Sequence, residues 1–248
     1  MDEPFLFLGF IFATFLLAGV VKGLIGLGLP TIAMGLLAIV LQPASAAALL
    51  VVPSFVTNVW QLAFGPAFKP LLWRLWPMLF GICVGTWLGA GTLASENGKT
   101  AILALGVALM VYAILGLSSV RFTVPARGER WLSGAVGVVT GLISAATGVF
   151  VIPSGPYLQA LALEKDDLVQ ALGLTFTVAT VALAVTLARD GVLNGPFALA
   201  SGLALIPALL GMAMGQWLRA RVRPEVFQLC FFAGLLLLGA HLAVRGLM

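Results

Sequence analysis

Charged residues are scarce in this sequence. Only 9% of its 248 residues are charged, whereas 61% are hydrophobic, and the mean hydropathy is +1.13. Soluble domains carry about 25% charged residues, so this chain could not hide its apolar surface from water by folding alone. The composition therefore excludes a soluble globular domain and predicts an integral membrane protein whose solvent is lipid.

The side chains that catalysis and metal binding require are scarce as well. The chain has one histidine, His241, and two cysteines, Cys83 and Cys230, which lie far apart inside apolar runs. No zinc-ligand spacing, P-loop or coherent set of nucleophile, base and acid is present. Basic residues are scattered over short loops rather than gathered into a nucleic-acid-binding face. We therefore expect no enzyme activity, no metal, no other cofactor and no nucleic-acid partner.

Carboxylates are missing from the clear hydrophobic segments, so a proton relay of intramembrane carboxylates is not expected. The acidic residues lie in loops or at segment edges, at Asp2, Glu3, Glu96, Glu129, Glu164, Asp166, Asp167, Asp190 and Glu225. The acidic start also argues against a cleavable signal peptide, whose first residues are basic. We expect the first hydrophobic run to remain in the mature protein.

Hydrophobic runs dominate what is present. Ten segments can be drawn, at residues 5–22, 24–41, 44–65, 70–94, 99–118, 131–147, 149–163, 167–188, 195–218 and 225–246. A helical span needs about 20 residues, which the third, fourth, ninth and tenth segments satisfy. The first two and the sixth and seventh are short and interrupted by Gly and Pro, so they are either thin spans or half-helices that enter and return. The fold class predicted is an all-α polytopic membrane protein of about 8–10 transmembrane or half-membrane helices.

An internal repeat divides the chain. Residues 19–25 match residues 137–143 at six of seven positions, and residues 75–81 resemble residues 205–211 in the same order. Each half holds five segments, and an odd number forces the second half into the opposite orientation, which is an inverted-topology repeat. We predict a first membrane repeat at 1–120, a basic cytoplasmic linker at 121–130 and a second membrane repeat at 131–248.

The distribution of Lys and Arg supports this inverted topology. With the N-terminus outside, the cations predicted inside are Lys22, Lys69, Arg74, Arg121, Arg127, Arg130, Lys165, Arg219, Arg221 and Arg223. Those predicted outside are Lys99, Arg189 and Arg245. This excess on one side follows the positive-inside rule, and the net charge of +4 is interpreted as topology-setting charge.

Glycine and proline interrupt both halves at corresponding places. Residues 22–31 read Lys-Gly-Leu-Ile-Gly-Leu-Gly-Leu-Pro-Thr, and the second half has residues 140–148 followed by Pro153 and Pro156. These residues weaken helices, and the amide groups freed at the start of a half-helix favour a bound anion. Paired interruptions are typical of transporter binding sites. The alternative is that the glycines serve only close helix packing.

Lys22 is the one lysine in the first 68 residues and lies deep in an apolar region. It either balances the charge of a bound anion or reaches the cytoplasmic boundary as a solvated side chain. Polar residues of the third and eighth segments either bind substrate or bond neighbouring helices: Ser54, Thr57, Asn58, Gln61, Gln170, Thr175, Thr177 and Thr180. The predicted substrate-binding residues are Lys22, Gly26, Gly28, Pro30, Thr31, Thr57, Asn58, Ser144, Thr147 and Ser154.

These residues give the chain a resemblance to the TauE/SafE family of sulfite exporters, also called toluene-sulfonate uptake permeases. The resemblance is carried by residues 23–28 with Pro30, by residues 43–48 and by residues 141–144, in matching order in two halves. It implies a prokaryotic inner-membrane permease, multi-pass, that moves sulfite, sulfonates or related small oxyanions. The second half departs from the family pattern at residues 144–148, which are less glycine-rich.

The function predicted is a secondary transporter of small oxyanions that works by alternating access at a midplane site between the two repeats. The expected partners are the small anionic substrate and the lipid bilayer, with a homodimer left open. Two alternatives are a passive small-anion channel and a membrane scaffold subunit that transports nothing.

Overall fold

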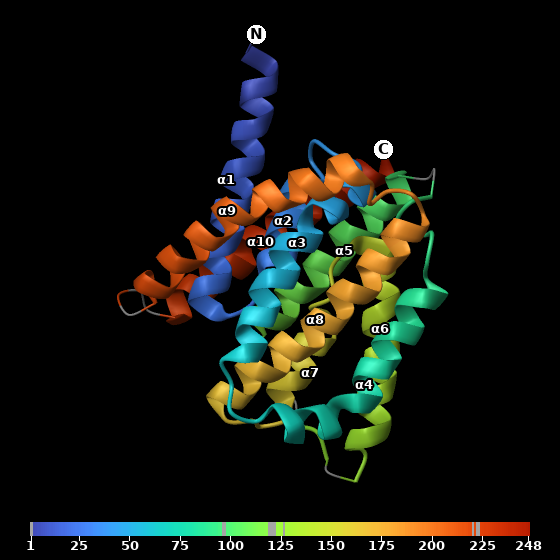
Figure 1. Ribbon diagram of the computed structural model, residues 1–248, viewed down its shortest axis with the longest axis vertical. Coiled ribbons are helices and arrows are strands. Elements are labelled where there is room, and N and C mark those ends of the chain that lie inside the picture. Colours follow the sequence, from blue (N-terminus) through green and yellow to red (C-terminus); the bar gives the residue numbers. More distant parts are fainter. Residues whose placement is uncertain (1, 96–97, 119–122, 126, 220, 222–223) are drawn as a thin grey trace.

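The computed structural model describes the whole chain except residues 1, 96–97, 119–122, 126, 220 and 222–223 (Figure 1). The described residues form ten helices and no strand. These are α1 (Asp2–Ile25), α2 (Leu29–Leu37), α3 (Pro43–Ala63), α4 (Phe68–Leu88), α5 (Gly98–Leu117), α6 (Glu129–Thr147), α7 (Ser154–Ala160), α8 (Lys165–Arg189), α9 (Gly195–Leu218) and α10 (Pro224–Leu247). Each helix lies within or close to one of the ten predicted segments, which confirms the all-α class.

Seven of the described helices are long and apolar enough to cross a membrane, namely α1, α3, α4, α5, α8, α9 and α10. By contrast, α2 has nine residues and α7 has seven. At a rise of about 1.5 Å per residue they reach about 13 and 10 Å, well short of a hydrocarbon core of about 30 Å. The chain is a multi-pass membrane protein, and the two short segments are half-helices.

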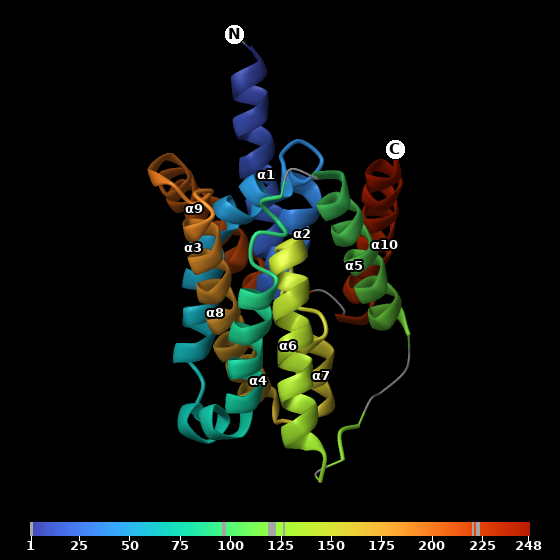
Figure 2. The same cartoon turned by 90° about the vertical axis from the view of Figure 1, so that its right-hand side faces the viewer.

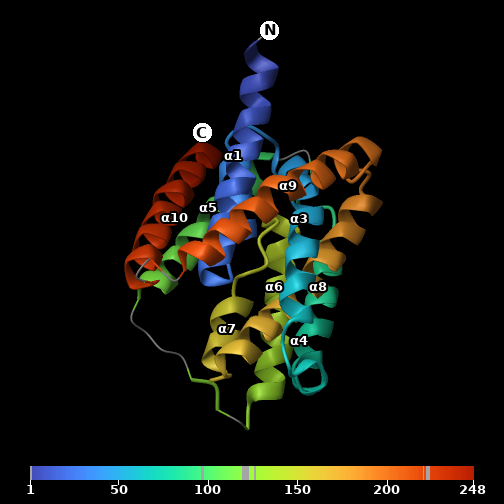
Figure 3. The same cartoon turned by 60° about the vertical axis from the view of Figure 1, so that its left-hand side comes forward.

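Glycines set the contacts of two helix pairs, α1 with α9 and α4 with α6 (Figures 2 and 3). A Cβ atom built on Gly19 of α1 would lie 2.2 Å from the carbonyl oxygen of Ala208. One built on Gly137 of α6 would lie 2.2 Å from the carbonyl oxygen of Met78. No real Cβ atom lies so close to a backbone oxygen, so only glycine permits these crossings. The packing interpretation is confirmed for these glycines.

Equivalent helices of the two halves run antiparallel. In α3 and α8, the Asn58 amide donates to the Thr180 hydroxyl at 3.3 Å, whereas Leu62, further along α3, accepts from the earlier Gln170 at 2.8 Å. In α5 and α10, a Cβ atom on Gly106 would meet Ala243, and one on Gly116 would meet Phe232. An inverted duplication produces this relation between counterparts.

Charged side chains at the two ends of the bundle agree with the predicted topology. At one end Arg74 pairs with Glu129 at 2.5 Å, both at helix starts predicted to lie inside. At the other end Lys99 donates to the carbonyl oxygen of Met248 at 2.7 Å, and Arg245 donates to that of Ala38 at 2.9 Å. Lys99 and Arg245, both predicted outside, therefore lie at the same end of the molecule.

Candidate functional site

The first-half interruption is a break between α1 and α2. Gly26 and Gly28 have φ angles of 78° and 106°, in the left-handed region that favours glycine. Pro30 occupies the first turn of α2, where a helix needs no internal amide donor. The predicted break at these residues is confirmed, and it leaves the start of α2 inside the protein, because Leu29 is fully buried.

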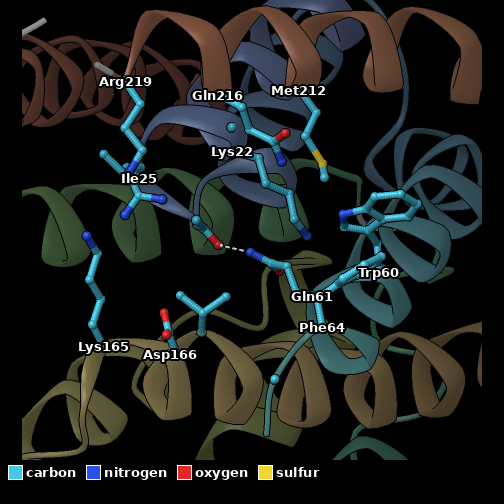
Figure 4. A pocket seen from close by; sticks show the side chains of 14 residues that line it. Lys22, Ile25, Trp60, Gln61, Phe64, Lys165, Asp166, Met212, Gln216 and Arg219 are labelled. Carbon is cyan, nitrogen blue, oxygen red and sulfur yellow. Dashed lines mark hydrogen bonds between the residues drawn. The ribbon is translucent and has the colours of Figure 1, made fainter. Parts of the chain in front are cut away.

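Side chains hold this break in place. The Gln61 amide donates to the carbonyl oxygen of Gly26 at 2.8 Å, and this bond is drawn in Figure 4. The Thr31 hydroxyl donates to the carbonyl oxygen of Gly28 at 2.9 Å. Because its hydrogen is used in this bond, Thr31 stabilises the turn and does not offer a donor to a ligand in this conformation.

Lys22 lies one turn before the break and begins a buried polar chain across three helices. Its side chain is 3% exposed, and its amino group donates to the Asn58 side-chain oxygen. The Asn58 amide donates to Thr180, whose hydroxyl donates to the carbonyl oxygen of Phe176 at 2.7 Å. The polar residues of the third and eighth segments, now α3 and α8, therefore meet at Asn58 and Thr180, next to Lys22.

Lys22 has no carboxylate partner in the described part of the chain, where Arg74 and Glu129 form the one ion pair. A solvated lysine at a membrane boundary keeps its amino group in water. An exposure of 3% therefore disfavours that interpretation of Lys22. Burying an ammonium group is unfavourable unless an opposite charge or several hydrogen bonds compensate it. The geometry thus leaves a place for an anion from outside the chain.

A cavity of about 370 Å³ adjoins Lys22 where α1, α3 and α9 end and α8 begins (Figure 4). Lys22, Lys165 and Arg219 bring three cations to its wall, against the single carboxylate of Asp166. Trp60, which is 51% exposed and lies 4.6 Å from the Phe64 ring centre, adds an aromatic surface. A cavity of this charge attracts small anions and can also accommodate an apolar substituent.

The loop between α3 and α4 beside this cavity is fixed by Gln170 of α8. Its amide donates to the carbonyl oxygens of Leu62 and Gly65, each at 2.8 Å, and its oxygen accepts from the Ala67 amide at 2.7 Å. Gln170 thus satisfies backbone groups that the end of α3 leaves without partners. For Gln170 the structure supports helix bonding, the alternative to substrate binding.

The second-half interruption separates α6 from α7. α6 ends at Thr147, Gly148 has a φ angle of 72°, and α7 begins at Ser154. The hydroxyls of Thr147 and Ser154 donate to carbonyl oxygens four residues back, each at 2.7 Å. The Ser144 hydroxyl is buried without a hydrogen-bond partner among the described residues. The break is confirmed, and of its predicted hydroxyls Ser144 alone keeps a free donor.

The two breaks lie at different heights along α3. A Cβ atom on Gly26 would approach Gln61, and one on Gly148 would approach Ala47, which is 61 − 47 = 14 residues earlier. Fourteen helical residues span about 21 Å. The structure brings Lys22, Gly26 and Asn58 together, but Ser144, Thr147 and Ser154 do not line the cavity at Lys22.

Thr57 likewise bonds within its own helix, donating to the carbonyl oxygen of Pro53 at 2.7 Å. The cavity instead includes Trp60, Lys165 and Arg219, which sequence reasoning did not assign to the site. Lys165 and Arg219 were interpreted as topology-setting loop charges. Like Lys22, both residues are predicted to lie on the inner side of the membrane. This shared side is the sequence signal that could have indicated that they lie near Lys22.

A family model described as sulfite exporter TauE/SafE matches residues 11–242 of the 248. A search of curated proteins gave no match, and neither did a search of solved structures. The matched range includes both helix breaks and all residues of the cavity.

Proposed function

Because the chain belongs to the TauE/SafE family of sulfite exporters, which are membrane transporters, we propose that it is a secondary carrier of small oxyanions. The substrate we propose is sulfite or an organosulfonate, carried across a prokaryotic inner membrane. No enzymatic step is needed for this function.

One observation carries the proposal. Lys22 is a buried cation without a carboxylate partner in the described chain, and it lines a cavity of about 370 Å³. A bound anion stabilises a cation that is buried in this way. In return, the anion accepts a charge-assisted hydrogen bond from the amino group, which contributes about 1.5–3 kcal/mol. Lys165 and Arg219 at the same cavity raise the local concentration of anions.

The antiparallel relation of equivalent helices supports alternating access as the mechanism. The cavity lies on the side that charge distribution predicts to be cytoplasmic, so this conformation receives an anion from inside. In inverted repeats the opposite conformation arises when each half adopts the arrangement of the other. The anion held at Lys22 would then leave on the outer side.

The decisive experiment measures binding and exchange on purified protein. Sulfite, methanesulfonate and toluenesulfonate should raise the melting temperature, and a preloaded sulfonate should drive counterflow of its labelled form into proteoliposomes. Lys22→Gln should weaken the binding of these anions about tenfold to hundredfold, since it removes one charge-assisted bond.

Lys69→Gln is the matched control. Lys69 is an exposed lysine on the same predicted side and does not line the cavity, so its replacement should change neither binding nor exchange. Unchanged affinity in Lys22→Gln would refute the role of Lys22. Saturable flux without counterflow would favour the channel, and the absence of both thermal stabilisation and flux would favour the scaffold.

A further inference from the structure

We propose that Lys22 carries a proton together with the anion, so that the transporter moves one proton with each anion in the same direction. This inference rests on the proposed function and adds its coupling ion. The observation behind it is the isolation of the Lys22 amino group in a polar but uncharged contact with Asn58.

The elements packed against α1 supply no compensating charge at the amino group. α2 and α3 contain no ionisable side chain at all. The charged or titratable side chains described on the other neighbouring elements are Lys165, Asp166, Asp167 and Arg189 of α8, Arg219 and Arg221 after α9, and Cys230, His241 and Arg245 of α10. Neither Asp166 nor Asp167 forms an ion pair with Lys22, and Arg245 bonds the carbonyl oxygens of Ala38 and Ile39.

Proton and anion therefore stabilise each other at this site. The anion supplies the opposite charge that the protonated amine lacks, and the protonated amine supplies the cation that the anion requires. By thermodynamic reciprocity, a bound proton raises the affinity for the anion by the same factor by which a bound anion raises the affinity for the proton. A carboxylate beside Lys22 would remove this dependence, because the charge would be compensated whether or not an anion is bound.

The chemical step is a simple protonation. On the side to which the cavity opens, a hydronium ion gives a proton to the Lys22 nitrogen, so that one O–H bond breaks and one N–H bond forms, and the anion binds to the resulting cation. After the conformational change the N–H bond breaks, the proton returns to water on the other side and the anion leaves. No electron transfer and no co-reactant is involved.

Electroneutrality is the measurable consequence. A monovalent anion accompanied by one proton moves no net charge, so a pH gradient drives its accumulation and a membrane potential does not. Without the proton, each cycle would move one negative charge, and the potential would drive accumulation instead.

The test uses the full chain in proteoliposomes with labelled methanesulfonate or toluenesulfonate, both of which stay monovalent between pH 6 and 8. With the potential clamped at zero, a gradient of one pH unit should accumulate the sulfonate up to about tenfold on the alkaline side. A potential at equal pH should produce no accumulation. The reverse result, accumulation that follows the potential and ignores pH, would overturn the proposal.

Lys22→Arg separates charge from proton transfer. Arginine keeps a cation at the site and does not release its proton in proteins. Counterflow should persist in this variant, whereas pH-driven accumulation should disappear; accumulation that persists would refute the role of Lys22 as proton carrier. Lys69→Gln should keep both activities. If Lys22→Arg does not fold, the wild-type gradient experiment still decides.

The two proposals fail in different ways. No counterflow with any of the anions would refute the carrier function and with it the coupling. Counterflow in wild type without pH-driven accumulation would refute proton coupling alone.

Discussion

The two helix breaks occupy corresponding places in the repeat but are built differently. In the first half, three residues separate α1 from α2, and two of them are glycines with positive φ. In the second half, six residues separate α6 from α7, and Gly148 is the one residue among them with positive φ. Thr140 stands where the first repeat has Lys22.

The two breaks also differ in the polar groups that they bring to the cavity. The cation and the cavity belong to the first break, whereas two of the three predicted hydroxyls of the second break bond their own backbone. The similarity of the halves therefore lies in their helix packing, and their difference lies in the groups at the breaks.

The largest effect is expected where the halves are alike, at the glycine crossings. Gly19→Ala and Gly137→Ala each place a Cβ atom 2.2 Å from a backbone oxygen of the partner helix, so the helices must separate. Each substitution should lower the free energy of unfolding by about 3 kcal/mol. Melting curves in detergent measure this, and a loss confined to one variant would contradict the equivalence of the two pairs.

Gly202→Ala is the control for that experiment. Gly202 lies in α9, and a Cβ atom built on it has no neighbour within 4 Å. Alanine should leave the stability unchanged or raise it by up to about 1 kcal/mol, since glycine is the weaker helix former.

The breaks themselves should differ in their tolerance of alanine. A Cβ atom on Gly28 would lie 2.6 Å from Val21, at a φ angle of 106°. One on Gly148 would meet the flexible end of Met34 at 2.8 Å, at a φ angle of 72° that lies closer to the left-handed helical minimum. Gly28→Ala should cost about 2–3 kcal/mol and slow counterflow, and Gly148→Ala about 1–2 kcal/mol.

Gly91→Ala isolates the backbone contribution in this comparison. Gly91 has a φ angle of 82°, and a Cβ atom on it would meet nothing within 4 Å. Its substitution should cost about 1 kcal/mol without affecting counterflow. Equal losses in Gly28→Ala and Gly91→Ala would show that contact with Val21 is unimportant.

Much of this architecture could be predicted from sequence, because helix boundaries in membranes follow local composition. The ten segments and both breaks depend on runs of apolar residues and on Gly and Pro, which act within one turn. The cavity could not be predicted in the same way. Lys165 and Arg219 reach it from helix ends distant in sequence, and whether Thr57 or Ser144 offers a free hydroxyl depends on its rotamer.

A smaller effect is expected at the proline inside α3, where a side chain of α9 replaces a missing helical hydrogen bond. Pro53 lacks an amide hydrogen, so the carbonyl oxygen of Leu49 loses its helical donor. Ser201 of α9 donates to this oxygen at 2.8 Å and accepts from the Val52 amide at 3.0 Å. Ser201→Ala should lower the free energy of unfolding by about 1–2 kcal/mol, because the buried carbonyl oxygen of Leu49 loses its donor. Ser95→Ala, at an exposed hydroxyl, should have no measurable effect.

The smallest effect is expected from the ion pair at the start of one glycine crossing. Arg74 and Glu129 join α4 to α6, and no such pair joins α1 to α9 in the described residues. The two side chains are 39% and 19% exposed, so solvent screens their attraction. A double-mutant cycle with Arg74→Gln and Glu129→Gln should give a coupling below about 1 kcal/mol, measured from melting curves. A coupling as large as the loss in Gly137→Ala would mean that charge holds α4 against α6, and the two crossings would then not be equivalent. A small coupling leaves close glycine packing as the feature that both crossings share.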